Sequence, residues 1–200
     1  MAWHNDQVSE LETEKIIEIA RECLKLPGDF VEMGCYKGDT SLMLAEVLRE
    51  YQKLASGKNV ENHVKKLWIY DSFEGLPKKK VEDESILGTS FKEGELVVSK
   101  REVKERFLRA GLPLPMIKKA WFNELKSEDL PEKIALAFLD GDFYDSIKDS
   151  LQLVGSRMVE GGIIIVHDYN NPVLPGVEKA VDEWITKEKT VTIYQSMAIV

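Results

Sequence analysis

The feature that most constrains the fold is a short apolar segment followed by a glycine turn, within residues 29–41. Its apolar residues, typical of a buried strand, are Phe30, Val31 and Met33. Gly34 and Gly38 permit a tight turn and a close approach of a ligand to the backbone. Asp39 or Thr40 can then cap a helix. A strand, turn and helix in this order are typical of ligand-binding edges in parallel sheets.

The spacing of the turn narrows the class of ligand. It matches neither the dinucleotide fingerprint G-x-G-x-x-G nor the P-loop G-x-x-x-x-G-K-[ST]. Instead, Glu32 precedes the turn in an E-x-G-x-x-x-G pattern. A carboxylate at this place suits a ligand with an amine and would repel a pyrophosphate. The pattern resembles motif I of S-adenosylmethionine-dependent methyltransferases.

Length and charge favour one globular domain that spans residues 1–200. The formal net charge of −8 argues against a nucleic-acid partner, because such binding depends largely on cationic contacts to phosphates. No apolar run has the length of a membrane span, and the first residues do not read as a signal peptide. Cys23 and Cys35 show neither C-x-x-C nor zinc spacing. We therefore expect a cytoplasmic protein with reduced thiols and no membrane partner.

Apolar runs alternate with amphipathic segments, which predicts an α/β fold with a mostly parallel sheet. The expected strands are residues 29–33, 67–70, 116–120, 134–139, 163–166, 190–194 and 197–200. Capping boxes at Ser9 and Ser99 begin two of the helices. Met158 is expected at the end of a helix, with Gly161-Gly162 as the turn before the next strand. Residues 1–28 would hold an N-terminal helix that Pro27-Gly28 ends. Residues 78–98 lack periodicity and would form a lid loop.

Seven segments of the chain match a known pattern, and two motifs among them, Asp-Ser-Phe-Glu-Gly-Leu-Pro and Asp-Gly-Asp-x-Tyr, are quite specific in this order. They are residues 32–38 (Glu-Met-Gly-Cys-Tyr-Lys-Gly), 70–77 (Tyr-Asp-Ser-Phe-Glu-Gly-Leu-Pro), 91–96 (Phe-Lys-Glu-Gly-Glu-Leu), 120–125 (Ala-Trp-Phe-Asn-Glu-Leu), 139–146 (Leu-Asp-Gly-Asp-Phe-Tyr-Asp-Ser), 161–169 (Gly-Gly to His-Asp-Tyr) and 179–184 (Lys-Ala-Val-Asp-Glu-Trp). With these segments, the chain resembles the macrocin O-methyltransferase (TylF/MycF-type) family, which methylates hydroxyl groups on antibiotic sugars and related compounds.

The resemblance implies a Rossmann-like methyltransferase fold, with a mostly parallel seven-stranded sheet, an antiparallel last strand and helices on both faces. It also implies an S-adenosylmethionine-dependent O-methyltransferase. The methyl acceptor would be a hydroxyl of a small molecule, such as a sugar, a vicinal diol or a phenol. A divalent cation, usually magnesium, would assist at the carboxyl ends of two central strands.

The resemblance also implies roles for single residues. Those expected to bind the cofactor are Glu32, Met33, Gly34, Tyr36, Gly38, Thr40, Asp71, Ser72, Phe73, Trp121 and Asp140. Among them, Asp71 follows the second strand, where a carboxylate can accept hydrogen bonds from ribose hydroxyls. Asp140 and Asp168 would be metal ligands. Asp142 would be the general base that accepts the proton of the acceptor hydroxyl.

The chain departs from the family at His167, where metal-using members typically have an aspartate. His167 could join Asp140 and Asp168 as a metal ligand and shift the preference from magnesium toward manganese, iron, cobalt or zinc. It could instead replace the metal, as a base or a group that orients the acceptor. A third interpretation is a strand-end residue bonded to backbone. The first is our working hypothesis.

Other functions also fit parts of the sequence. Asp140-Gly141-Asp142 is a D-x-D motif, which also occurs in metal-dependent glycosyltransferases and phosphatases, although the chain shows no glycine-rich phosphate cradle. A protein that binds the cofactor without catalysis is a further alternative. Family members often carry extra N-terminal helices that cover the acceptor and help to form a dimer, whereas about 28 residues precede the motif strand here. We therefore expect residues 78–98 to be the main lid, and a homodimer is one of the possible assemblies.

Overall fold

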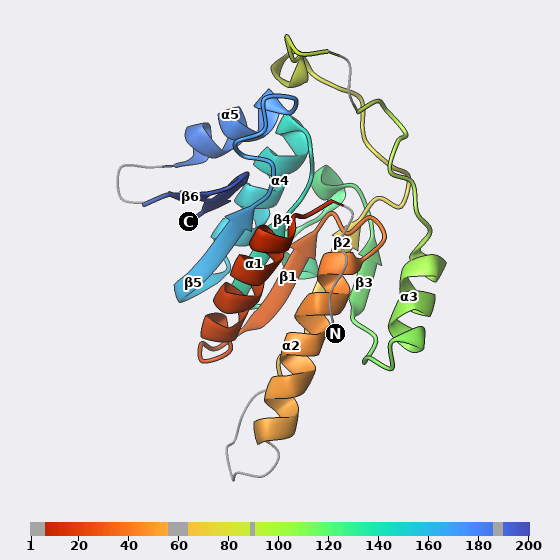
Figure 1. Ribbon diagram of the computed structural model, residues 1–200, viewed down its shortest axis with the longest axis vertical. Helices are drawn as coiled ribbons and strands as arrows, with labels where there is room; N and C mark the ends of the chain where they lie inside the picture. The colour runs from red at the N-terminus through yellow and green to blue at the C-terminus, as the bar shows by residue number, and fades with distance from the viewer. Residues whose placement is uncertain (1–6, 56–63, 89–90, 186–189) are drawn as a thin grey trace.

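One seven-stranded sheet forms the centre of the computed structural model, which describes residues 7–55, 64–88, 91–185 and 190–200 (Figure 1). The strand order is β3-β2-β1-β4-β5-β7-β6. The strands are β1 (Asp29–Met33), β2 (Leu67–Asp71), β3 (Met116–Lys119), β4 (Ile134–Leu139), β5 (Met158–Val166), β6 (Thr192–Tyr194) and β7 (Met197–Ile199). β1 to β5 pair in parallel, and β7 runs antiparallel to both of its neighbours. The predicted fold class is confirmed.

Helices cover both faces of the sheet (Figure 1). They are α1 (Glu10–Cys23), α2 (Asp39–Ala55), α3 (Lys100–Arg109), α4 (Tyr144–Gly155) and α5 (Pro175–Trp184). The apolar residues of α1, α2 and α3 pack into one core, and those of α4 and α5 into another. The strands separate the two cores because successive side chains point to opposite faces, as Phe30 and Val31 of β1 do.

Local sequence signals place the starts of α1 and α3 correctly, whereas α2 begins at Asp39 itself, so neither Asp39 nor Thr40 is the capping residue before it. Ser9 and Ser99 each accept a hydrogen bond from the backbone of the third helical residue, and the glutamate there bonds back to the serine, which confirms both capping boxes. The end of the first helix differs from the expectation. α1 ends at Cys23, several residues before Pro27 and Gly28.

The prediction for residues 158–162 was wrong. Met158 begins β5 instead of ending α4, and Gly161 and Gly162 lie inside the strand. Met158 pairs with Ile134 and Ile163 pairs with Leu136, so the register shifts between these pairs. Gly161 has a φ of 74°, a conformation that glycine adopts readily. The two glycines therefore form an irregularity within a long strand. The pattern of apolar residues alone cannot distinguish such an irregularity from a turn.

The segment after β2 arches over the carboxyl edge of the sheet before it reaches α3 (Figure 1). Asp83 Oδ1 accepts a hydrogen bond of 2.7 Å from the backbone N–H of Tyr144, at the start of α4. Ser85 Oγ donates to the carbonyl of Pro172 at 2.7 Å. These contacts tie residues 80–88 to the region of α4 and α5.

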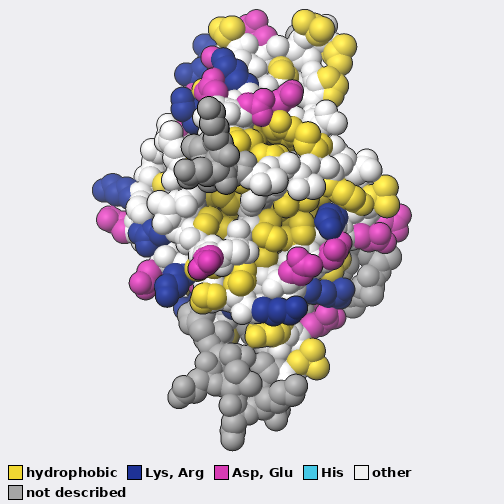
Figure 2. All heavy atoms as spheres, turned by 90° about the vertical axis from the view of Figure 1, so that its left-hand side faces the viewer, with side chains coloured by type: hydrophobic (Ala, Val, Ile, Leu, Met, Phe, Trp, Pro, Cys, Tyr) yellow, Lys and Arg dark blue, Asp and Glu magenta, His cyan; other side chains and the backbone are white. Residues whose placement is uncertain are grey.

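β6 is the outermost strand at one lateral edge of the sheet, and this edge faces the viewer in Figure 2. Hydrophobic side chains gather across the middle of this face, and charged side chains lie around them (Figure 2). Ile193 of β6 is 56% exposed. Within the described ranges, no helix combines the length and apolar character needed to cross a membrane.

Candidate active site

A cavity of about 230 Å³ opens at the carboxyl ends of the central strands. It lies where the strand order reverses, because β1 is followed on one side by β2 and on the other by β4. Open α/β sheets bind their ligands at such a switch point. Nine of the predicted site residues line the cavity: Gly34, Tyr36, Asp71, Ser72, Trp121, Asp140, Asp142, His167 and Asp168.

Five predicted cofactor residues do not line this cavity: Glu32, Met33, Gly38, Thr40 and Phe73. Glu32 is 1% exposed and accepts a hydrogen bond from Ser41 Oγ. It therefore lies behind the turn and supports the start of α2. Met33, Thr40 and Phe73 are also buried, and Gly38 faces Val103 of α3.

The glycine turn brings the ends of β1 and β4 into direct contact. The backbone N–H of Asp140 donates to the carbonyl of Met33 at 2.8 Å, and that of Gly34 donates to Tyr70 at 2.9 Å. Gly34 has a φ of 89°, and a Cβ at this position would lie 1.9 Å from the carbonyl oxygen of Asp140. Only glycine fits here.

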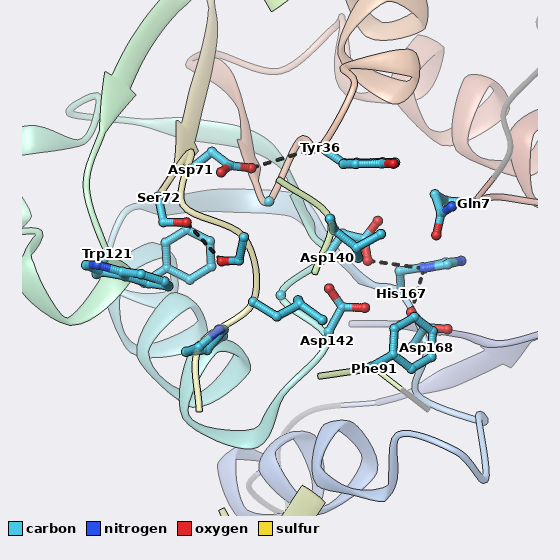
Figure 3. A pocket seen from close by; sticks show the side chains of 18 of the residues that line it. Gln7, Tyr36, Asp71, Ser72, Phe91, Trp121, Asp140, Asp142, His167 and Asp168 are labelled. Atoms are coloured by element: carbon cyan, nitrogen blue, oxygen red, sulfur yellow. Dashed lines mark hydrogen bonds and ion pairs between the residues drawn. The ribbon is translucent and has the colours of Figure 1, made fainter. Parts of the chain in front are cut away.

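Asp71 connects β2 to this turn. Its Oδ2 accepts hydrogen bonds from the backbone N–H groups of Cys35 at 2.9 Å and Tyr36 at 3.3 Å. Its Oδ1 accepts one from Phe73 at 2.7 Å. Both oxygens are thus held by backbone, while the side chain still borders the cavity (Figure 3).

Aromatic and small residues form the wall next to Asp71. Ser72 Oγ donates to the carbonyl of Gly75 at 3.1 Å, and Trp121 lies on the same side of the cavity (Figure 3). A Cβ on Gly141 would lie 3.3 Å from the ring of Phe122 and 2.8 Å from Ser146, so this wall is closely packed. It offers flat apolar surface with few polar groups, which suits an aromatic base.

Several lining residues had no predicted role: Gln7, Gly75, Leu76, Pro77, Phe91, Leu96, Ala120, Phe122, Gly141, Ser146 and Asn171. Most belong to the family-like segments, so their presence in those segments was an available signal. Gln7 precedes α1 and had no local signal, because only the packing of α1 against the sheet brings it to the cavity. Its side chain lies near Tyr36 and His167 (Figure 3).

Three side chains at the ends of β4 and β5 converge on one point (Figure 3). His167 Nδ1 lies 3.3 Å from Asp140 Oδ1 and 3.1 Å from Asp168 Oδ2. Asp168 is held on its other oxygen by Asn171 Nδ2 at 2.8 Å. Asp142 and Asp168 both adopt left-handed backbone, with φ of 59° and 60°. Such conformations persist where the surrounding structure enforces them, and often at functional sites.

The cavity is strongly acidic. Asp71, Asp140, Asp142 and Asp168 line it, and none of the described lining residues is a lysine or arginine. Burial raises the pKa of Asp142 well above its usual value, and Asp140 and Asp168 raise it further. Burial alone would lower the pKa of His167, but Asp140, Asp168 and Glu12 together hold it well above its usual value. This environment favours a cationic ligand.

The donor set fits a divalent cation. One ligand atom each from Asp140, His167 and Asp168 lie within 4.8 Å of one another. Adjacent ligands of an octahedral ion, with bonds of about 2.1 Å, lie about 3.0 Å apart. The two distances at His167 Nδ1 are close to this spacing. Two carboxylates and one imidazole suit manganese or another transition ion as well as magnesium.

The chain is similar to known O-methyltransferases. The chain is 30% identical over 149 residues to the 8-demethyl-8-(2,3-dimethoxy-alpha-L-rhamnosyl)-tetracenomycin-C 4'-O-methyltransferase of Streptomyces olivaceus, covering 72% of this chain and 54% of that protein. It is 28% identical to the mycinamicin III 3''-O-methyltransferase of Micromonospora griseorubida, covering 80% and 61%. The chain thus spans between about half and two thirds of the length of these curated relatives.

The fold is also similar to that of a solved O-methyltransferase. The structure of the O-methyltransferase NovP matches with a TM-score of 0.73 and 26% identity, over 92% of this chain and 78% of that one. The family model described as macrocin-O-methyltransferase (TylF) matches residues 8–197, which include every residue of the site described above except Gln7. The chain therefore belongs to the macrocin O-methyltransferase family.

Proposed function

We propose that this protein is an S-adenosylmethionine-dependent O-methyltransferase that acts on a hydroxyl group of a sugar or related small natural product. The observation that carries the proposal is that one acidic cavity, at the switch point of the sheet, has two parts of different composition. A glycine turn with Asp71 and an aromatic wall forms one part, and the cluster of Asp140, Asp142, His167 and Asp168 forms the other.

The first part suits the methyl donor, which supplies a methyl group already activated on a sulfonium. Backbone groups of the glycine turn, where Gly34 and Tyr36 line the cavity, would bind its methionine portion. Asp71 would accept from the ribose hydroxyls, and Trp121 and Ser72 would border the adenine. Because Glu32, Met33, Thr40 and Phe73 lie outside the lining, we assign them to support of the turn rather than to direct contact.

The second part suits the acceptor hydroxyl. Asp140, His167 and Asp168 would hold a divalent cation, which when bound lowers the pKa of a coordinated hydroxyl and fixes its orientation. Asp142 lies on the same loop and is the side chain that would take the proton. Burial and the neighbouring carboxylates raise the pKa of Asp142, so its ionised form is a stronger base than an ordinary aspartate. Alignment of the acceptor hydroxyl with the methyl donor would supply the rest of the rate acceleration.

The described part of residues 78–98 supports a lid in this proposal. Phe91 and Leu96 line the cavity, and the backbone N–H of Leu76 bonds to the carbonyl of Glu95 at 2.8 Å. This loop would cover the acceptor.

A cytoplasmic location belongs to the proposal as well, because Cys23 and Cys35 are both free and buried. A homodimer is also part of the proposal, and sedimentation velocity would test it.

The D-x-D alternatives lack support in the cavity. A glycosyltransferase or phosphatase would need groups that bind phosphate, whereas the described lining presents carboxylates and no lysine or arginine. Carboxylates repel a phosphate group unless a bound cation lies between them, so a phosphate ligand here would depend on that cation alone.

Calorimetry with S-adenosylhomocysteine, the demethylated cofactor, tests the proposal first. We expect micromolar binding that Asp71→Ala weakens at least tenfold. Transfer of a labelled methyl group to a panel of rhamnosides, vicinal diols and catechols then tests the reaction, with manganese or magnesium present. The absence of cofactor binding would contradict the proposal. Binding without transfer to any acceptor of the panel would favour a protein that binds the cofactor without catalysis.

A further inference from the structure

Glu12 is a capping-box glutamate in an unusual environment. It is the third residue of α1, yet it is only 4% exposed. Its Oε2 accepts from the backbone N–H of Ser9 at 3.0 Å and from Ser9 Oγ at 2.7 Å. Its Oε1 accepts from the backbone N–H of Ser196 at 3.0 Å and from Ser196 Oγ at 2.5 Å. A buried carboxylate is stable only when it is hydrogen-bonded, and four donors meet this need.

The second capping box of the chain shows that the cap does not require this burial. Glu102 of α3 accepts from the backbone N–H of Ser99 at 2.8 Å and from Ser99 Oγ at 2.7 Å. Glu102 is nevertheless exposed, and only its Oε2 takes part in the box. The two glutamates cap their helices in the same way, so the burial of Glu12 has another cause.

That cause is the packing of α1 against the ends of β5 and β7. Ser196 lies in the turn between β6 and β7, and His167 follows β5 directly. Glu12 Oε2 lies 3.9 Å from His167 Nε2, within ion-pair distance but longer than a hydrogen bond. His167 is itself 4% exposed. Its ring is thus enclosed, with Glu12 facing Nε2 and the Asp140–Asp168 pair facing Nδ1.

Metal-binding histidines usually direct their second ring nitrogen at a carboxylate or carbonyl, which fixes the tautomer and the ring orientation. We propose that Glu12 is a positioning residue that holds His167 with Nδ1 directed at the metal site formed with Asp140 and Asp168. This inference rests on the metal-assisted function proposed above. Glu12 itself touches neither the cofactor nor the reacting atoms.

The assignment makes two distant parts of the chain functional. The start of α1 and the β6–β7 turn, which hold Glu12, jointly set the orientation of a side chain at the end of β5. The same cap places Gln7, two residues before Ser9, in the wall of the cavity. α1 is therefore a support of the site and not only a cover of the sheet.

Glu12→Gln and its matched control Glu102→Gln separate positioning from capping. We would titrate each variant and the wild type with Mn²⁺ by calorimetry, and independently with S-adenosylhomocysteine. Both substitutions weaken a capping box, so both should lower the melting temperature. Glu12→Gln alone should lower the Mn²⁺ affinity, by about 10- to 100-fold. Cofactor affinity should change less than threefold in both.

Ser196→Ala provides a second measurement if Glu12→Gln fails to fold. It removes one donor to Oε1 and leaves the capping box intact, so we expect a drop of about threefold in Mn²⁺ affinity. Unchanged Mn²⁺ affinity in the Glu12 and Ser196 variants would overturn the inference while the proposed function stands. A wild type that binds the cofactor but no Mn²⁺ would also overturn it. A wild type that binds Mn²⁺ but no cofactor would instead contradict the proposed function alone.

Discussion

The two parts of the cavity use carboxylates in opposite ways. On the β1–β2 side, Asp71 accepts three backbone hydrogen bonds, so its charge stabilises a turn that would otherwise leave N–H groups unpaired. On the β4–β5 side, Asp140, Asp142 and Asp168 lie close together, and burial together with their mutual repulsion raises the pKa of Asp142. The first arrangement is stable by itself, whereas the second becomes favourable when a cation is bound. Substitutions on the two sides should therefore have opposite profiles of stability and binding.

Gly34→Ala should have the largest effect, because it disrupts the junction of both sides. The added Cβ would lie 1.9 Å from the Asp140 carbonyl oxygen and would need a φ near 89°. We expect a loss of about 3–4 kcal/mol in unfolding free energy, measured by urea denaturation. Gly94→Ala is the control, since Gly94 also has a positive φ, 79°, but a Cβ added there would meet no atom within 4 Å. It should cost about 1 kcal/mol, from the backbone conformation alone. Equal losses would show that the close contact does not matter.

Asp71→Ala should follow, with losses in both stability and cofactor binding. Removal of the carboxylate leaves the N–H groups of Cys35, Tyr36 and Phe73 without this acceptor. We expect the unfolding free energy to fall by about 2–3 kcal/mol. The loss is not larger because water in the cavity can partly replace the missing acceptor. Asp71→Asn, which keeps one acceptor oxygen, should lose about half as much. Unchanged stability in the alanine variant would show that these bonds do not hold the turn.

Asp140→Asn tests the other side and should separate binding from stability. Loss of a ligand should weaken Mn²⁺ binding about 100-fold by calorimetry. The unfolding free energy of the metal-free protein should change little, because the repulsion of Asp142 is relieved while the ion pair with His167 is lost. Asp145→Asn, in the first turn of α4, is the control and should leave Mn²⁺ affinity unchanged. A marked loss of stability in Asp140→Asn would place Asp140 with Asp71, as a structural carboxylate.

Glu32→Gln should produce the smallest effect, visible as a pH dependence. Burial, and secondarily the charges of Asp140, Asp71 and Asp39, raise the pKa of Glu32 to about 8, although the bond from Ser41 opposes the shift. The folded protein thus keeps a proton that the unfolded chain loses at lower pH. Glu32 therefore costs stability increasingly as pH rises from about 4.5 to about 8.

Urea denaturation of the metal-free protein at pH 5 and pH 8.5 measures this dependence. A full shift from 4.5 to about 8 would correspond to about 4 kcal/mol between these pH values. Because the structure relaxes and water enters when a buried group ionises, the advantage of Glu32→Gln over the wild type should be about 1–2 kcal/mol larger at pH 8.5. Glu14→Gln, an exposed position of α1, should show no such difference. A constant difference for Glu32→Gln at the two pH values would show that Glu32 is ionised throughout this range.

Local signals in the sequence were enough to predict the fold and part of the site. The apolar runs identified the central strands, the capping boxes at Ser9 and Ser99 located two helix starts, and the family-like segments identified the fold. Residues at the last position of a strand or directly after it, such as Asp71, Asp140 and His167, line the cavity because parallel strands end at one edge. These features depend on neighbours in the chain, so a sequence determines them directly.

Only the tertiary structure decided which residues face the ligand and which support it. Glu32 is one residue inside β1 and points into the core, so its carboxylate is buried behind the turn that it was expected to complete. Gly161 lies within β5 because pairing with β4 accommodates an irregularity. Glu12 and Gln7 reach the site through the packing of α1 on the sheet, which no local pattern encodes. The sequence by itself determined the elements and the chemistry at the strand ends, and long-range packing determined how that chemistry is supported.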